Sequence, residues 1–87
     1  METRIALLSI IVEDKDSVLS INNLLHEYRE YIISRMGVPY AKKDINLICV
    51  AMDAPSTAIS ALSGKLGMIH GVATKTLYSK LPKENGE

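Results

Sequence analysis

The stretch TRIALLSIIVED, residues 3–14, decides how the rest of the chain folds. It is short, rich in branched apolar residues and ends at two acidic side chains, a pattern typical of a buried strand. Alternate side chains of a strand face opposite sides of a sheet. One side would carry Ile5, Leu7, Ser9 and Ile11, and the other Ala6, Leu8, Ile10 and Val12. Both faces of this strand are apolar, which predicts a central position in a sheet.

The segment that follows, residues 14–32, changes to a helical period. Its apolar stripe recurs at steps of three and four residues and consists of Val18, Ile21, Leu25, Tyr28 and Ile32. This spacing predicts an amphipathic helix. Asp16 or Ser17 is expected to cap the helix, because a short oxygen side chain can accept a hydrogen bond from an exposed backbone N–H.

Four more elements complete the pattern: a strand at residues 31–40, a strand at 45–53, a helix at 54–67 and a strand at 68–80. Pro39 cannot donate to a ladder, so the strand at 31–40 is predicted at an edge of the sheet. Gly37 is expected to mark a bulge or a close backbone contact with a neighbouring subunit. Gly67 is expected to end the second helix in the left-handed conformation.

The order strand–helix–strand–strand–helix–strand predicts an α+β fold. It is the ferredoxin-like βαββαβ plan, a four-stranded antiparallel sheet with two helices on one face. We expect the first and third strands side by side in the centre, running parallel. The length of 87 residues allows one small domain, residues 1–80, followed by a polar, flexible tail at 81–87.

Composition excludes several classes of protein. The formal net charge is zero and no basic stripe stands out, so direct binding of nucleic acid is not expected. The single cysteine, Cys49, rules out a disulfide framework and indicates the cytoplasm. The apolar N-terminal run is too short to span a bilayer, so no membrane insertion is expected.

Two helices cover only one face of the predicted sheet, yet the central strands are apolar on both. An uncovered apolar face of this size is unusual on a monomer. We therefore predict a homo-oligomer, a dimer or tetramer, that packs through the helix-free face of the sheet. Arg35 and Gly37 on the edge strand are further interface candidates.

Few side chains are arranged for chemistry. His26 and Glu30 share a helix face, but a metal site needs three or four ligands, so a surface pair is the better interpretation. Cys49 lies inside a central strand, where it would act as a small apolar residue. Neither a nucleophile–base spacing nor a phosphate-binding loop is present. We predict no catalytic residues, no metal, no cofactor and no enzymatic activity.

Three stretches carry a resemblance to a known family: RIALLSIIVED, LLHEYREYIISRMGVPY and DAPSTAISALSGKLGMIHGVATKTLYSK. Together they resemble a family of small proteins described as regulators of an iron-only hydrogenase system. That family belongs with ACT-like domains and is similar to the C-terminal domain of nickel-responsive regulators. The resemblance spans roughly residues 3–80.

The resemblance implies an oligomeric module that regulates or senses a ligand. It places the small-molecule effector near the loop after the first strand, at Glu13, Asp14, Asp16 and Ser17. Such a module would link to transcription regulation through a partner, since no DNA-reading segment is present. The alternative is a scaffold protein that docks on a hydrogenase-maturation or redox partner.

Overall fold

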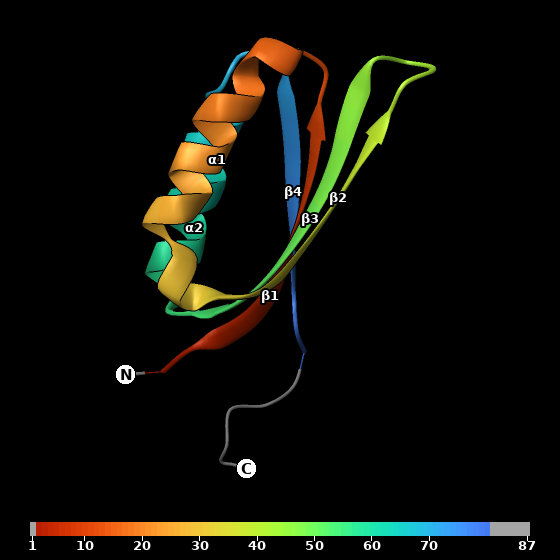
Figure 1. Ribbon diagram of the computed structural model, residues 1–87. Helices are drawn as coiled ribbons and strands as arrows, with labels where there is room; N and C mark the ends of the chain where they lie inside the picture. Colours follow the sequence, from red (N-terminus) through yellow and green to blue (C-terminus); the bar gives the residue numbers. More distant parts are fainter. Residues whose placement is uncertain (1, 81–87) are drawn as a thin grey trace.

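The order of elements in the computed structural model, which describes residues 2–80, is the predicted βαββαβ (Figure 1). The strands are β1 (Arg4–Val12), β2 (Ile32–Tyr40), β3 (Ile45–Ala54) and β4 (Val72–Tyr78). The helices are α1 (Val18–Glu27) and α2 (Ser56–Gly67), and two short 3₁₀ turns, η1 (Lys15–Ser17) and η2 (Arg29–Tyr31), flank α1. The predicted tail, residues 81–87, lies outside the described residues.

The four strands form one sheet in the order β2-β3-β1-β4, and every neighbouring pair is antiparallel. The first and third strands are central, as predicted, but the expectation that they run parallel is wrong. The β2–β3 connection is a hairpin, so β3 runs opposite to β2. Because β1 and β2 run in the same direction, β3 also runs opposite to β1. The fold is the ferredoxin-like α+β fold, of the ACT-like type.

Both helices lie on the same face of the sheet (Figure 1), and the core fills the space between. The even-numbered positions from 6 to 12 in β1 and from 48 to 54 in β3 point into this core and are at most 7% exposed. They meet apolar side chains from both helices. The helical members of the core are Ile21, Leu25, Ile59, Leu62 and Leu66.

The helix ends differ from the predicted ones. α1 stops at Glu27, and the residues that continue its stripe, Tyr28 and Ile32, pack against the core from the junction between α1 and η2 and from the start of β2. α2 includes Gly67 as its last residue, and the C-cap residue that follows, Met68, has right-handed backbone angles. The left-handed cap predicted at Gly67 is therefore wrong, and the positive φ of this connection falls at Gly71.

A hydrogen bond joins the two helical segments on the outside of the core. Lys65 on α2 donates from Nζ to the Tyr28 hydroxyl over 3.1 Å. This hydrogen bond, with the charge interaction with the same tyrosine, raises the pKa of Lys65 above its ordinary value. Lys65 itself is fully solvated, so the contact orients the two segments more than it stabilises them.

The other face of the sheet carries no helix and stays apolar. Its exposed side chains include Leu7, Ile11, Val38 and Leu47. Met36 is 69% exposed on this face, and Met68 is 87% exposed at the end of α2. Cys49 is also on this face and only half-buried. The predicted apolar, helix-free face is confirmed.

Two adjacent isoleucines of β1 test the assignment of the faces. Ile10 is 1% exposed and Ile11 is 41% exposed. We expect Ile10→Ala to lower the free energy of unfolding by about 2–5 kcal/mol, because it leaves a cavity in the core. Ile11→Ala should cost less than half as much. Chemical denaturation at low protein concentration measures both, and equal losses would contradict the assignment.

Candidate functional site

The loop between β1 and α1 is organised by Asp14. Its Oδ1 accepts a hydrogen bond from the backbone N–H of Asp16 over 2.9 Å. Its carbonyl oxygen accepts another from the N–H of Ser17, also over 2.9 Å. Asp14 thus caps the 3₁₀ turn η1 that leads into α1.

Ser17 occupies the N-cap position of α1, but its side chain does not cap the helix. The N-cap position predicted at Ser17 is therefore confirmed, whereas the side-chain hydrogen bond expected of it and the alternative cap at Asp16 are wrong. Instead, the Ser17 hydroxyl, buried at 7% exposure, donates to the carbonyl oxygen of His70 over 2.6 Å. This bond ties the start of α1 to the connection between α2 and β4.

Gly71 brings that connection against the loop. Its φ is +72°, and a Cβ at this position would lie 2.6 Å from the Cβ of Asp14. Its carbonyl oxygen also accepts a hydrogen bond from the N–H of Glu13 over 2.7 Å. Only glycine combines the positive φ with this close approach.

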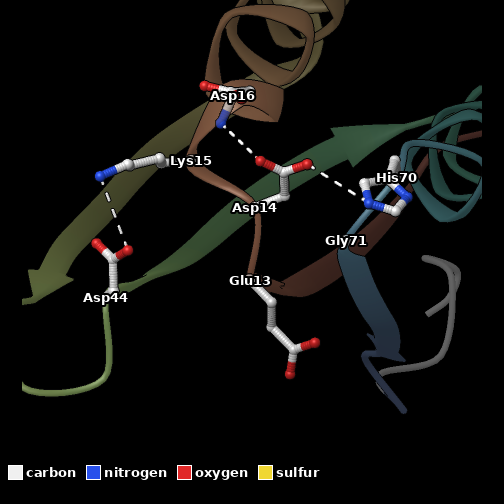
Figure 2. Close-up of a pocket in the computed structure, with 7 residues that line it drawn as sticks. All are labelled: Glu13, Asp14, Lys15, Asp16, Asp44, His70 and Gly71. Carbon is white, nitrogen blue, oxygen red and sulfur yellow. Dashed lines mark hydrogen bonds and ion pairs between the residues drawn. The ribbon is translucent and has the colours of Figure 1, made fainter.

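These contacts surround a polar pocket of about 460 Å³ (Figure 2). The residues that line it come from three segments: Glu13, Asp14, Lys15 and Asp16, then Asp44, then His70 and Gly71. Asp14 lies between Asp16 and His70 in Figure 2, and the Glu13 carboxylate points away from that group.

Two longer charged contacts cross the pocket. His70 Nε2 lies 3.5 Å from Asp14 Oδ2, and Lys15 Nζ lies 3.8 Å from Asp44 Oδ2. The Lys15 and Asp44 side chains are more than 70% exposed, so their ion pair contributes little to stability. The lining residues include four carboxylates but only one lysine and one histidine, which gives the pocket an excess of acidic groups.

The structure brings together three of the four predicted effector residues. Glu13, Asp14 and Asp16 line the pocket. Ser17 does not line it, and its buried hydroxyl binds the carbonyl oxygen of His70 instead. Sequence reasoning missed Asp44, His70 and Gly71. The last two could have been found from the topology, because antiparallel β1 and β4 place the end of one strand beside the start of the other.

The predicted interface candidates on β2 lie on the side of the sheet that faces the helices. Arg35 pairs with buried Val50, and it donates to Oδ1 of Asn22 on α1 over 2.6 Å. Gly37 pairs with Ile48, and a Cβ added at Gly37 would make only ordinary van der Waals contacts. The register shift of β2 falls between Ile32 and Ser34, so the bulge predicted at Gly37 is wrong, whereas the close contact with a neighbouring subunit stays a prediction.

Within residues 2–80, no group of three or more histidine, cysteine, aspartate or glutamate side chains is placed to hold a metal ion. His26, Cys49 and His70 lie on α1, on β3 and before β4, respectively. None of the helices in the same range is long and apolar enough to cross a membrane.

Fold and site together define a small ACT-like domain with a polar pocket at one end of its sheet. A family model described as "TM1266-like: Iron-only hydrogenase system regulator, putative" matches residues 4–76. The chain belongs to this TM1266-like family, which confirms the resemblance found in the sequence.

Two solved structures are similar to this chain. One is the uncharacterized protein TM1266 from Thermotoga maritima, with a TM-score of 0.87 and 36% identity over 91% of this chain and 100% of that one. The other is a formyltetrahydrofolate deformylase from Pseudomonas putida KT2440, with a TM-score of 0.60 and 14% identity. It aligns over 83% of this chain and 28% of its own length, and shows the fold alone. Comparison with curated proteins gives no match.

The contact at Gly71 can be tested against a second glycine. We expect Gly71→Ala to lower the free energy of unfolding by about 2 kcal/mol or more, because the alanine would combine a positive φ with a clash against Asp14. Gly64 lies inside α2 with nothing within 4 Å of an added Cβ. Gly64→Ala should therefore stabilise the protein by about 0.5–1 kcal/mol. Thermal and urea unfolding of both variants measure the difference, and a neutral Gly71→Ala would contradict the close approach.

Proposed function

We propose that this chain is a non-enzymatic, homo-oligomeric regulatory module that senses a small molecule at the pocket beside η1. One observation carries the proposal. Three segments that are far apart in the sequence, residues 13–16, Asp44 and residues 70–71, meet around one polar pocket. A ligand in this pocket would bridge the β1–α1 loop, the β2–β3 hairpin and the start of β4.

The charge of the pocket favours a ligand that carries a positive group, such as an amine. A concave surface lined with an excess of one sign of charge raises the local concentration of the opposite sign. Asp14 is the best-held carboxylate for this role, because its Oδ1 and its carbonyl oxygen both accept hydrogen bonds from the backbone of the 3₁₀ turn. Its side chain is only 33% exposed, against 76% for Asp44.

Membership in the TM1266-like family supports a regulatory role, and we propose that the regulated target is an iron-only hydrogenase system. The described residues form one ACT-like domain, without a separate nucleic-acid-reading element in residues 2–80. The module would therefore act through a protein partner, which reads the ligand-bound state. If no ligand binds, a scaffold role with the same partner is the competing proposal.

A thermal-shift screen of amino acids, polyamines, nucleotides and divalent metals tests the sensing role. A ligand present at 100 times its Kd stabilises the folded state by about 2.7 kcal/mol, because it binds only that state. For a domain of this size, this corresponds to a rise in Tm of roughly 10 °C or more. We expect the positive results among ligands with a cationic group.

Asp14→Asn should weaken binding of such a ligand at least tenfold, measured by calorimetry, since it removes the central negative charge of the pocket. Glu30→Gln is the matched control, because Glu30 lies in η2 and is not among the residues that line the pocket. Each Tm shift is taken from the variant's own ligand-free value. No shift with any compound in the screen would overturn the sensing role and favour the scaffold.

A further inference from the structure

We propose that the bare face of the sheet is covered by a second copy of this chain whose strands cross it at a steep angle. Two reciprocal ion pairs, between Lys75 of each copy and Asp53 of the other, would fix this arrangement. The inference rests on the oligomeric part of the proposed function and is independent of ligand sensing. The evidence for the crossed arrangement is the register of the four strands, which places Asp53 and Lys75 on this face.

The bare face is made of alternate residues of all four strands. Leu7 of β1 pairs with Ala51 of β3 and with Leu77 of β4, and the row that includes Ser9 runs from Met36 to Lys75. The full set of strand positions on this face is Ile5, Leu7, Ser9, Ile11, Ser34, Met36, Val38, Tyr40, Ile45, Leu47, Cys49, Ala51, Asp53, Ala73, Lys75 and Leu77.

Only two of these positions are charged, Asp53 and Lys75. Both are exposed, and neither has an ion-pair partner among residues 2–80. Asp53 pairs with Ile5, and Lys75 pairs with Ser9 on the other side of β1. The two charges therefore lie on a diagonal of the face, and Leu7 is at the midpoint of that diagonal.

Strand spacings of about 4.8 Å and a rise of about 3.4 Å per residue put the two charges roughly 16 Å apart. Consider a two-fold axis in the plane of the interface that passes over Leu7, perpendicular to this diagonal. It places Lys75 of each copy over Asp53 of the other, so that both ion pairs form at once. The strands of the two sheets then cross at roughly 70°, close to the orthogonal class of sheet packing.

The same axis brings apolar side chains together without further adjustment. It runs from Leu7, between Ala51 and Cys49, to Met36, so Leu7 and Met36 each meet their own copy. Ile5 of one copy lies over Leu77 of the other. These residues are well exposed in the single chain, from 39% for Leu7 and Ile5 to 67% for Leu77 and 69% for Met36.

An aligned packing would leave the charges unpaired. If the axis ran along β1 instead, Lys75 of one copy would lie over Cys49 of the other, in the apolar part of the face. A lysine ammonium without a partner is costly to remove from water. The position of the two charges thus favours the crossed arrangement.

Charge reversal tests the ion pairs. Light scattering and sedimentation at micromolar concentration should show a dimer or a multiple of it for the natural chain. Lys75→Glu and Asp53→Lys should each raise the dissociation constant of the dimer about tenfold or more, because each change creates two like-charge contacts. The double variant should return to within about threefold of the natural chain. Lys43→Glu, in the β2–β3 turn, is the control and should change nothing.

Cross-linking tests the axis. Two packed sheets lie about 10 Å apart, so Leu7→Cys in a Cys49→Ala background should be joined to its own copy by a short bis-maleimide. Ala73→Cys in the same background should not, because the crossed arrangement puts the two copies of residue 73 roughly 28 Å apart. Efficient cross-linking through residue 73 would overturn the crossed arrangement.

The remaining outcomes separate this inference from the proposed function. A natural chain that is monomeric at 100 µM would overturn both the crossed dimer and the oligomeric part of the proposed function. A dimer that is indifferent to both charge reversals, or that fails to cross-link through residue 7, would overturn the crossed arrangement alone. The ligand screen reports on sensing in every case.

Discussion

The pairing of β1 with two neighbours at once is the constraint on which the rest of the structure depends. β1 pairs with β3 over residues 4–12 and with β4 over residues 6–12. A strand enclosed in this way cannot slip by one residue, because a slip would move its whole apolar set to the other face. The core therefore has one register, and both helices are fixed against it.

The position of the pocket follows from the same pairing. Val12 and Val72 are partners at the last step of the β1–β4 ladder, so the residues just beyond them, Glu13 and Gly71, must meet. The loop after β1 has no glycine of its own in residues 13–17. The conformational freedom that this corner needs is supplied instead by Gly71, from the opposite strand. An acidic loop and a histidine 56 positions later in the chain thus become neighbours through strand register, with Asp14 and His70 in contact.

Local patterns in the sequence predicted the helices and strands of the fold and their order. The alternation in residues 3–14, the helical stripe through Ile21 and Leu25, and Pro39 in an edge strand all correspond to elements of the structure. The direction of β3 relative to β1 was misjudged. The alternation of apolar residues gives no information on the direction of a strand, which is set here by the β2–β3 hairpin. The predicted cap at Gly67 failed for a similar reason: the turn at Gly71 is imposed by contact with Asp14, which no local pattern records.

The loop carboxylates of the candidate site were visible in the sequence, whereas Asp44 and His70 reach the pocket only through the tertiary fold.

The alternation of β1 also separates positions at which selection can accept substitutions from positions at which substitutions would affect folding. Its even-numbered residues, such as Leu8 and Ile10, are enclosed by the helices, and substitutions there would affect folding itself. Its odd-numbered residues, such as Leu7 and Ile11, lie on the bare face and can vary without disturbing that core. Neighbouring codons of one strand are thus under different constraints. Relatives could therefore diverge in how they assemble while keeping the same fold and the same pocket.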